Sequence, residues 1–291
     1  MFEEIKKLIK AETYFFLVTP AFIWQFAFLV LPLIFVLILS LSQGQGSQLV
    51  QSFTLNNFYE IIDLSHIRII LRSIMLASTT AIASLLIAYP IAYFLALYVK
   101  RFKFFFLFLL SIPFLINLLV QVYAWFFILE KNGVINHTLM FLGVIQKPLN
   151  FLNSYFAIYL VMFHVYLPFM IMPLYSSLEK IDTKLIEASY DLGASFRTTF
   201  WRIILPLSMP GVQAGFFLVY VVSFGEYVIP SLLGGMKLFF VGTLISEYFF
   251  IGKDWHLGAA FICLSCGMLF LSALAYYWLF NKITLQSKIM R

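Results

Sequence analysis

Residues 154–177 read SYFAIYLVMFHVYLPFMIMPLYSS, a run of 24 residues that contains no Asp, Glu, Lys or Arg. A helix rises about 1.5 Å per residue, so this run is long enough to cross the roughly 30 Å hydrocarbon core of a bilayer. The run is continuously apolar and does not alternate with a period of two, as a strand of a membrane barrel would. The stretch therefore predicts a transmembrane helix.

The whole chain resembles this stretch in composition. Of its 291 residues, 63% are hydrophobic and 11% are charged, whereas about a quarter of the residues in a soluble domain are charged. One water-soluble domain could not bury this much apolar surface. The predicted fold class is an all-α integral membrane protein with six transmembrane helices. The predicted spans are residues 14–41, 73–98, 104–129, 154–177, 211–233 and 257–280.

The basic residues predict how these spans are oriented. Thirteen of the nineteen Lys and Arg residues fall in the N-terminal segment 1–13, the second and fourth loops, and the C-terminal tail 282–291. Basic loops remain in the cytoplasm, so both termini are expected there, in the cell inner (plasma) membrane. An even number of spans requires the same arrangement. Residues 14–281 form the membrane-spanning domain, with a cytoplasmic loop at 179–206.

Several kinds of chemistry lack the residues that they need. The phosphate-binding pattern G-x-x-x-x-G-K-[ST] does not occur in the sequence, which excludes ATP hydrolysis at a phosphate-binding loop of this kind. Cys263 and Cys266 lie in an apolar run without further metal ligands and are expected to pack, and the four His residues are scattered. We therefore expect no catalytic residue, no metal site and no bound cofactor. The net charge of +6 is explained by membrane orientation and not by nucleic-acid binding.

The loop 179–206 is polar enough to leave the bilayer but is patterned like a helix. Asp182 is a candidate N-cap, and Gly193 suits a C-cap that needs a positive φ. Ser195 can cap a second short helix, which is expected to end before Pro206. The pattern alone also fits an interfacial helix that lies on lipid headgroups. The apolar stripe of the first helix comprises Leu178, Ile181, Leu185, Ala188 and Leu192.

The order of residues in this loop resembles the "EAA" loop of ABC-importer permeases. That loop has the pattern E-A-A, three residues, Gly, then about nine residues and I-x-L-P, and the third position here is Ser189 in place of Ala. Further stretches, at residues 112–117, 167–182 and 224–235, are similar to the polyamine (spermidine/putrescine) branch of the binding-protein-dependent transport permeases. The positions that match the loop pattern are Glu187, Ala188, Gly193, Ile203, Leu205 and Pro206.

The resemblance implies a transport subunit that is not itself an enzyme. In the family, two homologous permease subunits work with an ATPase dimer, which binds the ATP, and with a periplasmic substrate-binding protein. The loop forms a coupling helix that docks in a groove of the ATPase. Carried over to this chain, Glu187 would contact the ATPase, and Gly193 would supply the bend between the two helices.

Glu226 is the only acidic residue well inside a predicted span. An ionisable side chain at mid-membrane costs about 2.5 to 3.5 kcal/mol, so it is normally paired or lines an aqueous path. A carboxylate beside aromatic faces suits an organic ammonium ion, although Glu226 could instead pair across a helix interface and only specify packing. The other substrate-pathway candidates are Tyr227 and Tyr220 near it and, as weaker ones in the third span, Asn117, Gln121, Tyr123 and Trp125.

Three classes of function remain open at this stage. The first is the permease subunit of an ATP-driven polyamine importer, and a close variant is an ABC permease for another small solute. The second is a self-sufficient secondary transporter, for which internal repeats and interrupted helices in matching positions are typical. The third, an intramembrane enzyme, would need paired His and carboxylate residues within the spans.

Overall fold

The computed structural model describes residues 18–43, 50–99, 101–235 and 238–289, with side chains described up to residue 282. Six helical segments in this part are long and apolar enough to cross a membrane, so the predicted fold class is confirmed. Residues 1–17, which include the predicted segment 1–13, and the last two residues of the tail 282–291 lie outside the described residues. The six segments are Val18–Ser40, Leu64–Leu97, Leu118–Phe141, Tyr155–Leu178, Phe196–Phe224 and Trp255–Lys282.

The chain divides into two units, of which the first comprises the described residues of 1–63 and 247–266. Its first span ends in helix α2 and leads into a short antiparallel hairpin. The buried Asn57 amide donates to the carbonyl oxygens of Ser40 at 3.0 Å and Ser42 at 2.9 Å, which ties α3 to the hairpin. The elements are a π-helical turn (Phe26–Val30), α2 (Leu31–Ser40), β1 (Ser42–Gln43), β2 (Ser52–Phe53), α3 (Asn56–Ile61), a second π-helical turn (Glu247–Ile251) and the beginning of α14 (Trp255–Ile289).

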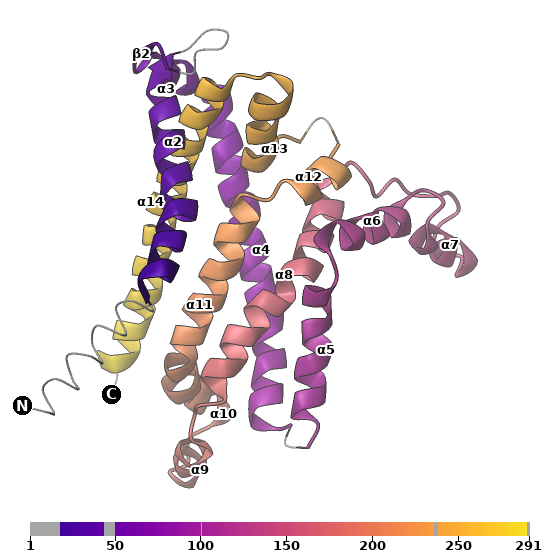
Figure 1. Ribbon diagram of the computed structural model, residues 1–291. Helices are drawn as coiled ribbons and strands as arrows, with labels where there is room; N and C mark the ends of the chain where they lie inside the picture. Colours follow the sequence, from indigo (N-terminus) through magenta and orange to yellow (C-terminus); the bar gives the residue numbers. More distant parts are fainter. Residues whose placement is uncertain (1–17, 44–49, 100, 236–237, 290–291) are drawn as a thin grey trace, which may run out of the picture. The chain divides into compact units, whose positions relative to one another are not determined.

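The second unit comprises the described residues of 64–246 and the rest of α14. Its long helices α4, α8 and α11 pack side by side (Figure 1). The elements are α4 (Leu64–Leu97), α5 (Lys103–Leu115), α6 (Leu118–Leu129), α7 (Val134–Phe141), α8 (Tyr155–Leu178), α9 (Thr183–Asp191), α10 (Phe196–Thr199), a π-helical turn (Phe200–Ile204), α11 (Leu205–Phe224), α12 (Val228–Leu233) and α13 (Val241–Ser246).

Small residues let α11 approach α8 closely. A Cβ atom on Gly211 would lie 2.5 Å from the Ser177 Cβ and 2.7 Å from the Pro173 carbonyl oxygen. One turn further along α11, a Cβ atom on Gly215 would lie 2.8 Å from the Met170 sulfur. Two glycines four residues apart form the small-residue face that allows backbones to pack tightly in membranes, where helix association depends on van der Waals contact.

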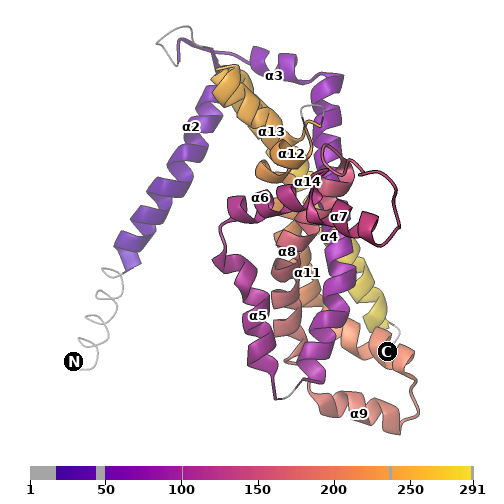
Figure 2. The same cartoon turned by 90° about the vertical axis from the view of Figure 1, so that its right-hand side faces the viewer.

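Two predicted spans are interrupted and are wrong as continuous helices. In place of one helix over 104–129, α5 ends at Leu115 and α6 starts at Leu118 in a different direction (Figures 1 and 2). In place of one helix over 211–233, α11 ends at Phe224 and α12 starts at Val228. The sequence is apolar on both sides of each break, so hydropathy did not reveal them. The backbone N–H and C=O groups that lose their helical partners at a break are hydrogen-bonded by polar side chains within the unit.

The fifth span begins earlier than predicted. The second short helix of the loop does not end before Pro206, because α10, the π-helical turn and α11 form one helical run. Leu205 donates to the carbonyl of Phe200, five residues back. In this wider turn one backbone carbonyl has no N–H partner four residues further on. Proline has no N–H to donate, so Pro206 can follow the turn without the loss of a hydrogen bond, and the helix continues.

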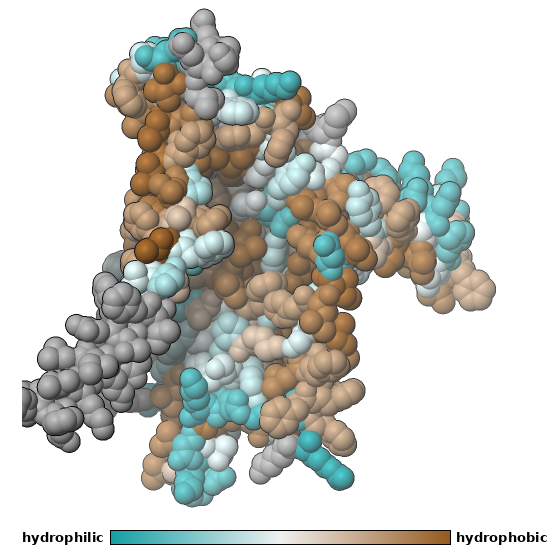
Figure 3. All heavy atoms as spheres, in the orientation of Figure 1, coloured by the Kyte–Doolittle hydropathy of each residue, from teal (hydrophilic) through white to brown (hydrophobic). Residues whose placement is uncertain are grey.

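Hydrophobic and hydrophilic side chains are separated along this unit. On the face shown in Figure 3, α5 presents hydrophobic side chains along its length, and hydrophilic side chains gather at the end of the bundle where α9 lies. This distribution suits helices whose sides contact lipid and whose connecting segments contact water.

Candidate transport site

The loop between α8 and α11 folds as two helices joined by a glycine turn. The Asp182 carboxylate accepts from the Lys184 backbone N–H at 3.0 Å and caps α9, as predicted. Gly193 has φ +79°, the left-handed conformation that the sequence predicted there. The Ser195 hydroxyl accepts from the Thr198 N–H at 3.4 Å and caps α10. The predicted interruption of the loop at Gly193 is therefore confirmed.

The outer surface of α9 is uncovered in this chain. Glu187 and Ala188 are exposed, and Leu185 and Leu192 expose 50% and 88% of their surface. The single apolar stripe predicted from Leu178 to Leu192 is wrong, because α8 extends to Leu178 and α9 starts only at Thr183. The change of helix direction buries the first two stripe residues and leaves the later ones uncovered.

Ser189 and Thr199 form an elbow between α9 and α10. Their hydroxyls are hydrogen-bonded at 2.9 Å, and both residues are buried. The Ser189 hydroxyl also reaches the Ile186 carbonyl oxygen at 2.7 Å. Because α10 continues into α11, where Leu205 and Pro206 form the first turn, the elbow ties α9 to the root of a membrane-spanning helix.

Lys103 and Glu179 form an ion pair between α5 and α8. Lys103 starts α5 and Glu179 follows α8, and the ammonium also lies 5.4 Å from the centre of the Tyr175 ring. The hydrogen bond from Lys103 lowers the pKa of the Glu179 carboxyl below its ordinary value, and the carboxylate raises the pKa of the Lys103 ammonium. Both groups are charged at neutral pH and join the ends of the two helices.

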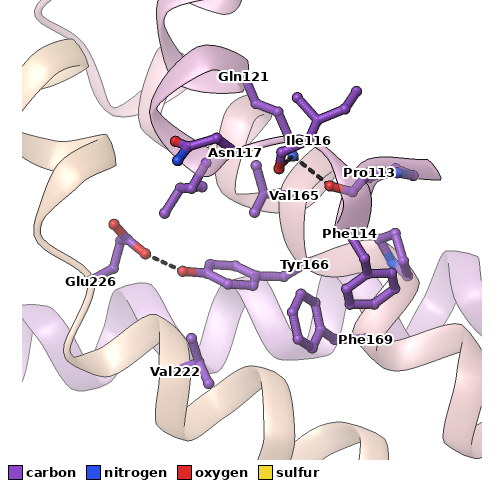
Figure 4. Close-up of a pocket in the computed structure, with 12 residues that line it drawn as sticks. Pro113, Phe114, Ile116, Asn117, Gln121, Val165, Tyr166, Phe169, Val222 and Glu226 are labelled. Carbon is purple, nitrogen blue, oxygen red and sulfur yellow. Dashed lines mark hydrogen bonds between the residues drawn. The ribbon is translucent and has the colours of Figure 1, made fainter. Parts of the chain in front are cut away.

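A pocket of about 430 Å³ lies where the two helix breaks face α8 (Figure 4). Residues of the α5–α6 break lie on one side, and Glu226 from the α11–α12 break lies on another. Aromatic rings form part of the wall. The lining residues are Pro113, Phe114, Ile116, Asn117, Leu118, Gln121, Val165, Tyr166, Pro168, Phe169, Val222 and Glu226.

Glu226 lies in the α11–α12 break and not within a helix, which corrects its predicted position. Its side chain is 8% exposed. One carboxylate oxygen accepts from the N–H groups of Val228 at 2.9 Å and Ile229 at 3.2 Å, and so caps α12. The other oxygen accepts from the Tyr166 hydroxyl of α8. Three donors leave about one of the four acceptor positions of a carboxylate for a further partner.

Amide side chains hold the other break in a similar way. The Asn117 side-chain oxygen accepts from the Leu119 N–H at 2.8 Å and caps α6. The Gln121 amide nitrogen donates to the carbonyl oxygens of Pro113 at 2.7 Å and Ile116 at 3.0 Å. The amide oxygen of Gln121 is buried without a hydrogen-bond partner among the described residues. This oxygen is an unused acceptor in the wall of the pocket.

The pocket brings together only some of the predicted pathway residues. Glu226, Asn117 and Gln121 line it. Tyr220 is fully buried and bonds Ser272 at 2.7 Å, outside the pocket. Tyr227 and Tyr123 are 45% and 48% exposed and do not line it. Trp125 packs edge-on against His164 with 5.3 Å between the ring centres, also outside the pocket.

Tyr166 is a polar pocket residue that sequence reasoning missed. It lies inside the charge-free run with which the sequence analysis began, and one more tyrosine among the aromatic residues of α8 gives no signal. Only the fold shows that its hydroxyl reaches the carboxylate of a residue 60 positions away.

The arrangement favours cations over anions. The lining residues offer two acceptors, the carboxylate of Glu226 and the buried, unpaired amide oxygen of Gln121, and one donor, the amide nitrogen of Asn117, and none of them is basic. The aromatic rings of Phe114, Tyr166 and Phe169 flank them (Figure 4). Acceptors and aromatic rings together can hold an organic ammonium group by charge, hydrogen bonds and cation–π attraction.

Curated relatives share most of the chain. The spermidine/putrescine transport system permease protein PotB of Escherichia coli (strain K12) is 38% identical over 238 residues, which cover 81% of this chain and 86% of that protein. PotB of Haemophilus influenzae is 34% identical over 265 residues, covering 90% and 92%. The spermidine/putrescine transport system permease protein PotC of E. coli K12 is 44% identical over 69 residues, covering 24% and 26%.

Solved structures and a protein family match as well. A crystal structure of a bacterial alginate ABC transporter, in complex with an alginate pentasaccharide-bound periplasmic protein, contains a chain with a TM-score of 0.74 at 16% identity, covering 96% of this chain and 97% of that one. At this identity the likeness concerns the fold alone. Residues 88–284 match the family described as "Binding-protein-dependent transport system inner membrane component". This chain belongs to that family of multi-pass inner-membrane proteins.

Proposed function

We propose that this chain is the transmembrane permease subunit of an ATP-driven importer that takes up polyamines such as putrescine and spermidine. It is not an enzyme and needs no cofactor of its own, because ATP is bound by a partner ATPase dimer. The other partners are a second, homologous permease subunit and a periplasmic substrate-binding protein. Both termini face the cytoplasm.

The observation that carries the coupling role is the uncovered surface of α9. Leu185 and Leu192 leave half or more of their apolar surface uncovered at the hydrophilic end of the bundle, and the same helix also exposes the carboxylate of Glu187. Uncovered apolar side chains beside charged ones mark a surface that binds another protein. The Ser189–Thr199 elbow connects this surface to α11. A push on α9 would thus move α11, which ends two residues before Glu226, at the pocket.

The polyamine assignment is supported by the chemistry of the pocket and by the named relatives. A carboxylate, an unpaired amide oxygen and three aromatic rings suit the primary and secondary ammonium groups of a polyamine. Two relatives whose matches cover 81% and 90% of this chain are named as spermidine/putrescine permeases. Glu226 and Asn117 are therefore the strongest pathway candidates, whereas Tyr227, Tyr220, Tyr123 and Trp125 remain expectations from the sequence.

The test is reconstitution of the complete complex in liposomes. ATP hydrolysis and uptake are measured with putrescine, with spermidine and with a neutral solute of similar size, each presented with the binding protein. We expect stimulation by one or both polyamines alone. Stimulation by an unrelated solute only would identify a permease of the same kind with another cargo.

A secondary transporter remains the second candidate, because the structure contains two interrupted helices, which secondary transporters also use. The same liposomes separate the two functions. Polyamine uptake that continues without the ATPase subunit would favour the secondary transporter and overturn the proposed coupling. Uptake that needs both the ATPase and ATP would support the importer.

A further inference from the structure

A second pocket, of about 450 Å³, lies between the beginnings of α4 and α8 and is lined by two arginines. Arg68 and Arg72 are one turn apart on α4, and Tyr155 and Tyr159 are one turn apart on α8. Phe240 also lines the pocket, with its ring edge-on to Tyr155 at 6.3 Å. This pocket lies at the end of the bundle away from α9.

The two arginines have no acidic partner in the structure. Neither guanidinium forms an ion pair with any carboxylate of the residues that the structure describes. Like charges four residues apart on a helix repel each other by a few tenths of a kcal/mol. The remaining polar groups of the pocket are the phenols, and the Tyr159 hydroxyl is hydrogen-bonded to that of Thr79 at 2.9 Å. A pocket with two guanidiniums and no carboxylate binds an anion.

The helix geometry places this pocket at the level of lipid headgroups. α4 has 34 residues and is about 51 Å long, which exceeds the roughly 30 Å core of a bilayer. The first two and a half turns, with Arg68 and Arg72, take up about 14 Å, and the other 25 residues, about 37 Å long, still span the core when these turns lie beyond the hydrocarbon. Tyrosines such as Tyr155 and Tyr159 also favour this level.

An uncovered apolar stripe continues from the pocket along α4. Leu71 and Met75, which are 52% and 66% exposed, form part of the lining, and Ile82 and Leu86 follow on the same face with 44% and 70% exposed. From Arg72 to Ile82 the helix rises about 15 Å, the depth of one leaflet of hydrocarbon. Two cationic groups above an apolar stripe of this length match a phosphate headgroup and its acyl chain.

We propose that this pocket binds an anionic phospholipid, with its phosphate between Arg68 and Arg72 and an acyl chain along the stripe from Leu71 to Leu86. Arginine binds phosphate through paired hydrogen bonds, which a lysine cannot reproduce. The lipid fills the space between α4 and α8 at the end remote from the coupling loop. The site is independent of the cation pocket at Glu226 and of the nature of the transported solute.

Native mass spectrometry of the delipidated complex tests the site, with the complex purified through a tag on this chain and titrated with phosphatidylglycerol or phosphatidylcholine. We expect the wild type to retain phosphatidylglycerol preferentially. The double variant Arg68→Gln/Arg72→Gln should bind it about tenfold more weakly or worse, because two charge-assisted contacts are lost. The variant Arg68→Lys/Arg72→Lys keeps both positive charges and should bind phosphatidylglycerol with intermediate affinity. It serves as the control for a folding defect in the glutamine variant.

The matched control is Lys131→Gln/Lys147→Gln. It removes the same charge from two exposed residues that do not line the pocket, and it should bind phosphatidylglycerol like the wild type. The proposal is overturned if the arginine variants also retain the lipid, or if the two lipids bind equally. It is overturned as well if inorganic phosphate at millimolar concentration displaces the lipid, because the pocket would then bind free phosphate. It is also overturned if the arginine variants retain the lipid but lose affinity for the binding protein.

Discussion

The hydroxyls of Ser189 and Thr199, which are hydrogen-bonded at 2.9 Å in the buried elbow between α9 and α10, link the exposed loop to a membrane helix. We expect Thr199→Val, which keeps the side-chain shape, to cost about 1 kcal/mol in the free energy of unfolding. Ser189→Ala should cost about the same, and in the double variant the second change should cost little more. Denaturant unfolding in detergent micelles measures the cycle, and fully additive effects would show that the bond contributes nothing.

The exposed carboxylate of Glu187 gives the second prediction. Glu187→Lys reverses a charge on the uncovered surface of α9 without touching the interior of this chain. We expect normal insertion and stability but loss of ATP-driven uptake, measured in the reconstituted complex. Asp191→Lys, which reverses an exposed charge one turn further along α9, is the control for charge reversal alone and should retain more of the uptake. Normal uptake by Glu187→Lys would contradict the proposed docking role.

The sequence predicted the class of fold and the turn in the loop because both depend on local patterns. Apolar runs that contain no charge and are long enough to cross a bilayer indicate helices in lipid. A glycine after a capped amphipathic segment indicates a residue with positive φ at the end of a helix. Gly193, Asp182 and Ser195 all occupy the positions expected from these rules.

The candidate cation pocket could be predicted only in part. The Glu226 carboxylate was conspicuous because charges are costly within a span. The break that surrounds it was not, because the side chain itself supplies the acceptor that the first N–H groups of α12 need. Tyr166 is separated from it by 60 residues, so their contact depends on how α8 packs and carries no local signal.

The close approach of α8 and α11 gives the third prediction. In Gly211→Ala, the new Cβ would meet the Pro173 carbonyl oxygen at 2.7 Å, so backbone must move. Such overpacking costs about 1 to 3 kcal/mol, which we expect as a lower thermal midpoint of the purified protein. Gly267→Ala on α14 is the matched control, because among the described residues no atom outside the local helix backbone lies within 4 Å of the new Cβ. Equal midpoints for the two variants would show that α11 can shift freely on α8.

The Lys103–Glu179 ion pair predicts a pH dependence. The pKa of Glu179 is lowered in the folded protein, so the pair stabilises the fold above the ordinary carboxyl value of 4.5. This contribution is lost as the pH falls through the lowered pKa. The raised pKa of Lys103 maintains the pair on the alkaline side until the pH rises beyond the ordinary lysine value of 10.5.

The comparison is between the wild type and Glu179→Gln. At pH 7 the wild type should have a slightly higher thermal midpoint, because exposed ion pairs contribute little. The difference should shrink as the pH falls below 4.5 and vanish at a pH below the lowered pKa of the Glu179 carboxyl, where the carboxylate of the wild type is protonated. A difference that is the same at both pH values would assign the effect to packing against Tyr175.

The last prediction separates the two roles that the structure allows for Glu226. Glu226→Gln keeps an oxygen for the N–H groups of Val228 and Ile229 but removes the negative charge. Tyr166→Phe keeps the charge and removes the hydroxyl that the carboxylate accepts from. If the charge holds a cationic solute, Glu226→Gln should raise the half-saturating polyamine concentration by about tenfold or more, since a hydrogen bond to a charged group contributes about 1.5 to 3 kcal/mol.

Tyr166→Phe should then leave the half-saturating concentration nearly unchanged or lower it, because an acceptor position of the carboxylate becomes free for the ammonium group. If Glu226 only connects α12 to α8, both variants should instead lower the thermal midpoint and the maximal rate together, with similar half-saturating concentrations. Uptake by proteoliposomes over a range of polyamine concentrations distinguishes the two patterns. An unchanged uptake curve for Glu226→Gln would remove this residue from the transport path, and the amide side chains of Asn117 and Gln121 would then be the polar candidates that remain in the pocket.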